Sequence, residues 1–407
     1  MFVEAQIEKK LADLQARGQL PLAIELWNGQ RFAPAGDAPV TLRFPGTAAL
    51  KRLANPDLAA LGEAYVEGEV DIDGPIEEAF RGAERLVRGW GKALEGRLRG
   101  RLPSLSLHTR KLDSEAIKYH YDVSNDFYRL WLDAQMVYSC AYFRTGSEDI
   151  DTAQAQKLDH ICRKLQLAPG DRLLDIGCGW GALVCHAAMH YGVHAQGLTL
   201  SEEQFAYAKE KVARLGLQDK VTLELRDFAS AEGGFDKIAS IGMFEHVSTA
   251  DTPNYFRTIH RLLKPGGLYL HHAITIRARE YERMRRGKSP ALGWIRRYIF
   301  PGGEASHVAM AIANLELHGF EVHDIEAWRE HYARTTRFWH DRLAANRAAA
   351  EREVGEVKTR LWLAYLAGSS IGFARGSACV FQTLASKRVR GPSGLPSTRA
   401  DLYGGRT

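Results

Sequence analysis

Short apolar runs alternate with helix-forming stretches from about residue 150 to residue 366. Each run of apolar or alternating residues is typical of a strand, and each longer stretch with apolar residues on one side is typical of a helix. The predicted strands are 173–175, His194–Thr199, Val221–Arg226, Lys237–Met243, Leu268–Ile274 and Phe320–Glu326. The predicted helices are Thr152–Leu165, Ala182–Met189, Glu202–Leu215, Thr252–Leu263, Val308–Leu317, Tyr332–Ala350 and Lys358–Leu366. This alternating order predicts an α/β fold with a doubly wound parallel sheet, which binds ligands beyond the carboxyl ends of its strands.

The first part of the chain has a different pattern, which predicts a small α+β domain over residues 1–95. A helix is expected at Val3–Leu14, strands at Ile24–Leu26 and Val40–Phe44, a short helix at Ala48–Ala54 and a strand pair within Leu61–Ile72. No catalytic constellation occurs in these residues, so an accessory or lipid-binding role is predicted.

Three further segments complete the predicted organisation. Residues 96–115 are basic and contain proline and serine, which is typical of a linker. Residues 116–388 form the large domain, in which the arginine-rich stretch Thr275–Pro301 and the following helices are interpreted as lid insertions. Residues 389–407 are rich in glycine, proline, serine and arginine, so we expect a disordered tail.

The net charge of +5 matters only where basic residues gather. Residues 81–111 carry nine lysines and arginines against two glutamates, with aliphatic residues at helical spacing between them. Such a run is either a solvated face or an amphipathic helix that contacts an anionic membrane surface. No aromatic platform or known motif accompanies the charge, so nucleic acid is not expected as a partner.

The cysteines and the terminus indicate a cytoplasmic protein. There are five cysteines, an odd number without metal-ligand spacing, which favours reduced thiols. The first residues lack the apolar core of a signal peptide. Leu361–Phe381 is the stretch nearest to a membrane span, but Arg375 and several serines and glycines interrupt it, so it predicts a buried helix. No clustered histidines and carboxylates predict a metal site.

The segment L-L-D-I-G-C-G-W-G at Leu173–Gly181 is the strongest candidate for a binding site. A strand, a glycine turn and a helix start offer backbone N–H groups without interference from Cβ atoms. Asp175 can accept a ligand ammonium or hydroxyl. The pattern also fits a dinucleotide site, but the second strand ends in G-L-T-L-S without an acidic ribose partner. Thr199 and Gln204 are then the candidate ribose partners, which favours a class I S-adenosylmethionine (SAM) methyltransferase with a Rossmann-like sheet.

Seven motifs in order carry a resemblance to a known family. They are H-Y-D-V-S-N-D-F-Y (120–128), V-Y-S-C-A-Y-F (137–143), D-I-G-C-G-W-G (175–181), G-L-T-L-S-x-x-Q (197–204), I-G-M-F-E-H-V (241–247), L-K-P-G-G (263–267) and W-I-R-R-Y-I-F-P-G-G (294–303). Over about residues 116–385 the chain resembles the cyclopropane-fatty-acyl-phospholipid synthases and the mycolic-acid cyclopropane synthases. Residues 1–100 resemble the N-terminal domain of the bacterial phospholipid enzymes.

This resemblance implies transfer of a methylene group from SAM to the cis double bond of unsaturated acyl chains in membrane phospholipids. It also implies a homodimer, a peripheral position at the inner face of the membrane, and a bound bicarbonate ion as the base. The positions that match the bicarbonate ligands are Cys140, Glu245, His272, the backbone of Ile274, and Tyr332. The positions that match the SAM site are Tyr138, Ser139, Asp175, Gly177, Gly179, Thr199, Leu200, Gln204, Asp227 and Phe228.

The residues themselves support this interpretation unevenly. A single cysteine in an apolar strand, such as Cys140, is usually part of a core, and His272 beside a second histidine is ambiguous. Glu245 is harder to explain as core, since a buried unpaired carboxylate is costly. Ala305-Ser306 and Arg337 depart from the family pattern in the lid. Two alternatives therefore stay open: a methyltransferase that makes methyl- or methylene-branched acyl chains, and a lipid-surface binding protein without turnover.

Overall fold

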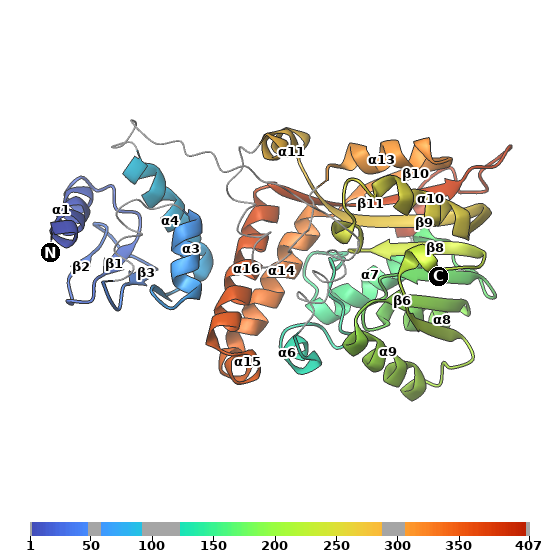
Figure 1. The fold of residues 1–407 in the computed structure, drawn as a ribbon, viewed down its shortest axis with the longest axis horizontal. Helices are drawn as coiled ribbons and strands as arrows, with labels where there is room; N and C mark the ends of the chain where they lie inside the picture. Colours follow the sequence, from blue (N-terminus) through green and yellow to red (C-terminus); the bar gives the residue numbers. More distant parts are fainter. Residues whose placement is uncertain (1, 48–57, 92–122, 287–305, 404–407) are drawn as a thin grey trace.

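The computed structural model describes residues 2–47, 58–91, 123–286 and 306–403, which fold around two separate sheets (Figure 1). The expected helix at Ala48–Ala54, the linker at 96–115 and the part of the predicted lid insertion after residue 286 lie outside the described residues.

The smaller sheet belongs to the N-terminal domain and has the strand order β2-β1-β3-β4. Its strands are β1 (Ala23–Glu25), β2 (Arg31–Phe32), β3 (Thr41–Arg43) and β4 (Asp71–Asp73). β1 and β3 are parallel, and the other two pairs are antiparallel. The helices α1 (Phe2–Ala16), α3 (Leu58–Val66) and α4 (Ile76–Gly91) contribute to its buried core, which is built from aliphatic side chains such as Leu11, Ile24 and Leu42.

The strand pair predicted within Leu61–Ile72 is wrong, because the first half of this segment belongs to helix α3. Leu61, Ala64 and Tyr65 are all buried. Their spacing of three and four residues places them on one face of a helix. The alternation of glutamates with apolar residues suggested a strand, but alanine, leucine and glutamate are good helix formers. A strand forms only afterwards, at β4.

The larger sheet has seven strands in the order β10-β11-β9-β8-β5-β6-β7. The strands are β5 (Arg172–Ile176), β6 (His194–Thr199), β7 (Val221–Leu225), β8 (Phe235–Ile241), β9 (Leu263–Ile276), β10 (Phe320–Ala327) and β11 (Ala378–Lys387). Strands β7, β6, β5, β8 and β9 are parallel to their neighbours in this series. The order reverses at β5, so β5, β6 and β8 create a switch point where their carboxyl ends leave a crevice.

Helices cover both faces of this sheet, as the sequence predicts for a doubly wound fold (Figure 1). One face carries α8 (Ala182–Tyr191) and α9 (Glu202–Arg214), with α7 (Ile150–Lys164) packed on α8. The other face carries α10 (Thr252–Leu262) and α13 (Val308–Leu317). Separate apolar clusters fill the two interfaces, one around Ile161 and Val184 and the other around Phe256 and Leu315.

The C-terminal helices differ from the prediction in two places. The helix expected at Tyr332–Ala350 is divided into α14 (Arg329–Ala345) and α15 (Arg347–Val354), because Asn346 leaves the helical conformation between them. The buried helix expected to reach Phe381 ends earlier, since α16 spans Glu356–Ala374. Gly376 then reverses the chain with a φ of 71°. The residues after it form β11, which is antiparallel to both β9 and β10.

Short elements complete the described chain. They are α6 (Asn125–Arg129), α11 (Ala278–Arg285), α17 (Ala400–Tyr403) and the 3-10 turns η1 (Phe228–Ser230) and η2 (Phe244–His246). Among the described residues, no helix combines the length and the apolar character needed to cross a membrane.

The small domain docks on helix α16 through α3 and α4 (Figure 1). Arg360 of α16 is only 5% exposed and donates to the carbonyl oxygens of Tyr65 (2.9 Å) and Val70 (3.3 Å). Arg360 also pairs with Asp71. Arg337 of α14, a departure from the family pattern, pairs with Glu77 of α4. This departure is therefore part of the contact between the two domains.

The prediction of a disordered tail is wrong for residues 389–403. Leu402 is buried, and Leu395 packs against the core between α7 and the sheet. Tyr403 Oη donates to Glu326 Oε1 (2.9 Å), and Arg399 pairs with Asp324. Both acceptors lie on β10 and also face the buried Lys164 of α7. A composition typical of disorder is thus overridden by specific ion pairs and one apolar anchor.

Candidate functional site

The glycine turn after β5 begins the site at the switch point. Gly177, Gly179 and Gly181 all have positive φ angles, of 80°, 54° and 77°. This left-handed conformation is open to glycine at little cost. A Cβ atom at Gly177 would also lie 3.0 Å from Met243 Cβ. The turn therefore needs glycine for its conformation and for its close approach to the loop after β8.

A cleft opens above this turn, with about 1350 Å³ of space that is partly open to solvent. All ten residues predicted for SAM binding lie on its walls: Tyr138, Ser139, Asp175, Gly177, Gly179, Thr199, Leu200, Gln204, Asp227 and Phe228. We call this space the cofactor cleft. Residues from five separate segments converge here because the ends of β5, β6, β7 and β8 and the loop before α7 share one edge of the sheet.

One end of the cofactor cleft is polar and charged. Asp175 is 3% exposed, and its Oδ1 has no hydrogen-bond partner among the described residues. Burial raises the pKa of Asp175 to about 7, although nearby Lys157 opposes the shift. Lys157 Nζ donates to Ser139 Oγ at 2.9 Å. Burial lowers the pKa of Lys157 to about 8, against the opposing effect of Asp133 and other nearby acids.

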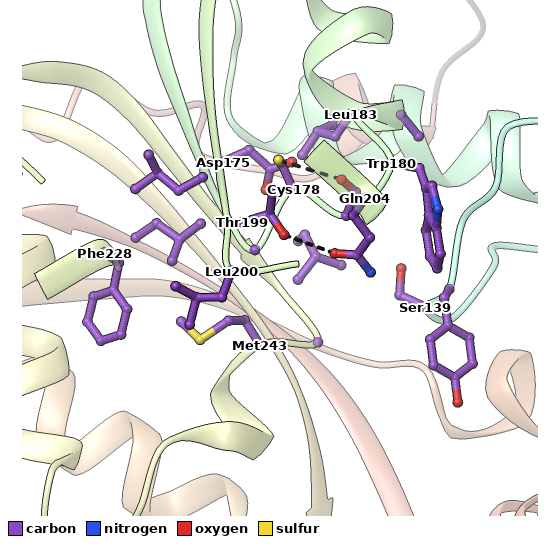
Figure 2. A pocket seen from close by; sticks show the side chains of 18 of the residues that line it. Ser139, Asp175, Cys178, Trp180, Leu183, Thr199, Leu200, Gln204, Phe228 and Met243 are labelled. Atoms are coloured by element: carbon purple, nitrogen blue, oxygen red, sulfur yellow. Dashed lines mark hydrogen bonds between the residues drawn. The ribbon is translucent and has the colours of Figure 1, made fainter. Parts of the chain in front are cut away.

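The other end of the cleft is mostly apolar (Figure 2). Leu200, Met243 and Phe228 lie together there, away from Ser139 and Trp180. Between the two ends, Thr199 Oγ1 donates to Gln204 Oε1 at 3.0 Å. The cleft is therefore complementary to a ligand with a charged end, a hydroxylated middle and a flat apolar end.

The five residues matched to the base site do not line the cofactor cleft but lie behind its wall. We call Cys140, Glu245, His272, Ile274 and Tyr332 the buried cluster. Two of them meet directly, because the N–H of Ile274 donates to Glu245 Oε1 at 2.6 Å. Glu245 Oε2 is buried, and within the described part of the chain it has no hydrogen-bond partner. Burial raises the pKa of Glu245 to about 7, so the carboxyl is partly neutral near neutral pH.

The other three members surround Trp328, the residue that precedes α14. His272 packs edge-on against the Trp328 ring with centroids 5.5 Å apart. Cys140 Sγ lies 3.7 Å from the Trp328 carbonyl oxygen, which also accepts from the Tyr332 N–H at 3.0 Å.

Trp328 also links these residues to the Glu245–Ile274 pair. The backbone N–H of Trp328 donates to the carbonyl oxygen of Val380 at 2.8 Å, and Val380 is paired with Ile274 in the sheet.

Burial shifts the pKa values of Cys140, His272 and Glu245 toward the neutral forms of these side chains. Burial raises the pKa of the Cys140 thiol and lowers the pKa of His272 well below its ordinary value. Burial also raises the pKa of Tyr365 of α16 to about 12. The charge of Glu245 contributes to this shift, so Tyr365 lies near Glu245. The cluster is thus a low-dielectric environment, in which a charge is costly unless a partner compensates it.

An aromatic wall packs in the same apolar core as Cys140 and Tyr332 of the cluster. Tyr138 lies 5.2 Å from Trp339 and 5.4 Å from Trp131 between ring centroids. Trp131 in turn lies 5.4 Å from Trp362 of α16. Such electron-rich ring faces attract cations and exclude water.

Comparison with known proteins identifies this arrangement. Residues 108–383 match the family described as mycolic acid cyclopropane synthetase, and residues 12–86 match a family described as a domain of unknown function. The chain belongs to the mycolic acid cyclopropane synthetase family. It is accordingly a SAM-dependent methyltransferase of this family, with the class I fold.

Curated relatives cover almost the whole chain. The chain is 40% identical over 387 residues to a probable fatty acid methyltransferase of Pseudomonas putida, covering 94% of this chain and 96% of the relative. It is 32% identical over 381 residues to the cyclopropane-fatty-acyl-phospholipid synthase of Escherichia coli, covering 90% and 93%. Both alignments therefore extend over the two domains.

A solved structure of the family is similar to two thirds of this chain. The mycolic acid cyclopropane synthase CmaA1, determined with S-adenosylhomocysteine (SAH) and CTAB, is 34% identical, with a TM-score of 0.64. The match covers 67% of this chain and 98% of the CmaA1 chain. The assignment of individual residues to SAM contacts stays a prediction, which the shape and polarity of the cleft support.

The residues of the buried cluster can be compared with the bicarbonate site that the family resemblance implies. Glu245 Oε2, which has no hydrogen-bond partner in the described ranges, belongs to a carboxyl with a raised pKa and has the chemistry to hydrogen-bond a small oxyanion. Ile274 departs from the expected ligand role, because its N–H already donates to Glu245. The side chains present fit such an ion, and the backbone donor would have to leave Glu245 to join them.

The sequence analysis missed Lys157, which reaches the polar end of the cleft from α7. A signal was available, because Ile150, Gln154, Lys157, Ile161 and Lys164 recur at helical spacing and all prove to be buried. A lysine within the core-facing stripe of a helix is unusual, since lysines are almost never fully buried without a partner.

Proposed function

We propose that this enzyme transfers a one-carbon unit from SAM to the cis double bond of unsaturated acyl chains in membrane phospholipids and closes a cyclopropane ring. Membership of the family and the likeness to the E. coli phospholipid enzyme support the substrate class. The observation that carries the proposal is the position of Glu245. Gly242 and Met243 line the cofactor cleft, and Glu245 follows them with its carboxyl turned into the buried cluster.

The reaction requires both the cofactor cleft and the buried cluster. When the S–CH₃ bond breaks and the methyl carbon bonds to one olefin carbon, the sulfonium becomes the thioether SAH and the other olefin carbon becomes a carbocation. Loss of one proton from the new methyl group then closes the ring. The aromatic wall around Tyr138 stabilises the cation and excludes water.

The buried cluster would manage the departing proton. A bicarbonate ion held by Cys140, Glu245, His272 and Tyr332, with the backbone of Ile274, would supply a proton acceptor at this place. Glu245, with its pKa raised to about 7, can donate to or accept from such a neighbour close to neutral pH.

The second candidate function is a methyltransferase that makes methyl- or methylene-branched acyl chains. The names of several relatives favour it: the P. putida protein is a probable fatty acid methyltransferase, and a 31% identical Mycobacterium tuberculosis relative is a tuberculostearic acid methyltransferase. The two functions share the methyl transfer and differ in where the carbocation loses its proton. The complete set of four matching side chains in the buried cluster favours ring closure.

A mass-spectrometric assay separates these outcomes. Purified full-length protein is incubated with SAM and unsaturated phosphatidylethanolamine vesicles, and the acyl chains are analysed with olefin-specific derivatisation. A gain of one CH₂ with loss of the olefin supports ring formation. The same gain with an olefin retained, or a saturated methyl branch formed with an added reductant, would transfer the proposal to the branched products. SAH binding without any gain would indicate a binding protein without turnover.

We further propose that the protein contacts anionic membrane surfaces through a basic hollow between its two domains. Arg81, Arg85 and Arg88 of α4 and Arg375 after α16 line it, together with Glu84. Anionic lipids attract such a group by about 1 kcal/mol for each nearby arginine. Cytoplasmic location at the inner face of the membrane and a homodimer accompany this proposal as expectations from the family.

Vesicle sedimentation tests the membrane proposal. The Arg85→Glu/Arg88→Glu variant should lose binding to phosphatidylglycerol vesicles, whereas Arg31→Glu on β2 of the same domain should keep it. Binding of the wild type should weaken in high salt, because salt screens exposed charges. Salt-insensitive binding, or equal binding by all variants, would remove the electrostatic explanation.

A further inference from the structure

Lys157 is the unexplained charge in the cofactor cleft. Its side chain is 2% exposed, although burial of an ammonium is unfavourable unless a partner compensates it. Its one hydrogen bond within the described chain goes to the neutral hydroxyl of Ser139. Asp133 nearby is already engaged, because its two oxygens accept from the backbone N–H groups of Val137 and Gln135. The protein therefore holds a buried cation at the cleft without a carboxylate bonded to it.

The hydrogen bond to Ser139 has a direction that matters. Lys157 carries only donors, so Ser139 Oγ accepts from it and keeps its own O–H hydrogen for another acceptor. Ser139 and Asp175 both line the cleft, and Figure 2 shows Gln204 between them. A hydroxyl that accepts from a cation is polarised and becomes a stronger donor. The Ser139 hydroxyl, polarised by the positive charge of Lys157, is therefore available to donate to a ligand at this end of the cleft.

Asp175 supplies the complementary charge. Its Oδ1 is buried on the cleft wall and partnerless in the described structure, and Lys157 acts on it electrostatically without a direct hydrogen bond. The other lysine or arginine on the described lining is Arg226, which is paired with Glu224 at 3.1 Å. Arg226 adjoins Asp227 and Phe228 and so belongs to the apolar end. The polar end thus offers one acceptor for a cation and one charge-backed donor for an anion.

We propose that Lys157 is a positioning residue for the amino-acid end of SAM. Asp175 receives the ligand ammonium, Ser139 O–H donates to the ligand carboxylate, and Lys157 stabilises that carboxylate through Ser139. The ligand group recognised is a zwitterionic α-amino acid, so the same residues discriminate SAM and SAH from adenosine thioethers that lack this group. The inference rests on the proposed function only in taking SAM as the ligand.

Calorimetric binding of three ligands to the full-length protein tests the proposal. SAH carries the complete amino acid, 5′-(3-aminopropyl)thioadenosine lacks the carboxylate, and 5′-methylthioadenosine lacks both charged groups. In Lys157→Met, the dissociation constant for SAH should rise at least about 30-fold, as expected for loss of a desolvated charged partner. For the two ligands without a carboxylate, the dissociation constants of Lys157→Met should stay within about twofold of the wild-type values.

Two further variants distinguish positioning from a general structural role. Lys211→Met removes another buried lysine, whose Nζ donates to the carbonyl oxygen of Gln135 outside the cleft lining, and should leave all three affinities unchanged. Ser139→Ala should weaken SAH selectively, and adding Lys157→Met to it should have much less effect than in the wild type. This non-additivity is expected only if Lys157 acts through Ser139.

The contrary results are also clear. Equal weakening of all three ligands in Lys157→Met would show a structural role, and unchanged SAH binding would show no role; either overturns the inference. Additive effects of Ser139→Ala and Lys157→Met would remove the route through Ser139. Failure of the wild type to bind SAH at all would instead contradict the proposed function, whatever the variants do.

Discussion

The cofactor cleft and the buried cluster share two segments of the chain, yet they differ in physical character. In the loop before α7, Ser139 faces the cleft and Cys140 faces the cluster. In the loop after β8, Met243 faces the cleft and Glu245 faces the cluster. The cleft presents polar groups to a ligand, whereas burial in the cluster shifts the pKa values of Cys140, His272 and Glu245 toward their neutral forms.

This difference separates the two tasks that the enzyme must perform. A binding surface needs polar groups whose partners come from the ligand, such as Asp175 Oδ1. A site that manages a carbocation and one departing proton needs a dry environment in which small changes of charge are strongly felt. Changes in the cleft should therefore alter ligand affinity, and changes in the cluster should alter turnover.

The largest expected effect comes from Glu245→Gln in the buried cluster. The amide keeps the oxygen that accepts from Ile274 but removes the titratable group, so turnover should fall about 1000-fold, within the range for acid–base groups. The affinity for SAH should stay within about twofold. Glu232→Gln, at an exposed position, is the matched control. Normal turnover in Glu245→Gln would remove this carboxyl from the chemistry.

The same variant should be more stable than the wild type at high pH. The pKa of Glu245 rises from 4.5 to about 7 on folding, so between these values the folded state binds more protons than the unfolded state. The wild type therefore loses stability as pH rises through this window, by about 3 kcal/mol in total. Glu245→Gln lacks this loss, so its advantage in urea unfolding should be small at pH 5 and largest at pH 8. A pH-independent difference would contradict the raised pKa.

Asp175→Asn should produce the reverse pattern in the cofactor cleft. Asp175 Oδ1 has no hydrogen-bond partner among the described residues. Replacing this carboxylate by an amide removes the acceptor charge for the ligand ammonium, so the dissociation constant for SAH should rise about 30-fold. Turnover at saturating SAM should fall much less than in Glu245→Gln. If turnover falls strongly while affinity is preserved, the division of tasks between cleft and cluster is wrong.

The smallest expected effect comes from Thr199→Val in the middle of the cleft. The change conserves shape but removes the hydroxyl that donates to Gln204 and accepts from the Ser201 N–H at 3.2 Å. Loss of about 1 kcal/mol of hydrogen bonding predicts roughly fivefold weaker SAH binding, with turnover at saturation unchanged. Thr222→Val on exposed β7 should leave affinity as it is. A larger loss of turnover than of affinity would show that Thr199 acts in the chemistry.

Local patterns predicted the large domain well because its elements are long and their periodicity is clear. The strands β5 to β10 and the helices α8, α9, α10 and α13 between them follow from apolar runs and helical spacing. The failures lie where local patterns are ambiguous. Alternation in Leu61–Ile72 suggested strands, but the packing of Leu61, Ala64 and Tyr65 selects a helix. The tail became ordered through Arg399, Leu402 and Tyr403, whose partners on β10 are distant in the sequence.

The residues of the site differ in how far the sequence alone predicted them. Asp175 and the glycines of the cofactor cleft followed from the strand–turn–helix pattern itself. The members of the buried cluster came from the resemblance to a family, since Cys140 or His272 alone resembles an ordinary core residue. Lys157 was missed because only tertiary packing shows that it reaches Ser139 and the cleft.

By itself, the sequence determined the alternation of strands and helices, the glycine turn, and the class of ligand that such a turn binds. These features depend on backbone conformation and on neighbours within a few turns of chain. Tertiary structure alone decided that β11 runs antiparallel, that Glu245 bonds to Ile274, and that a lysine of α7 lies behind a serine of the cleft. Those contacts join residues far apart in the chain, and burial, which no local pattern measures, sets their charge states and hence their chemistry.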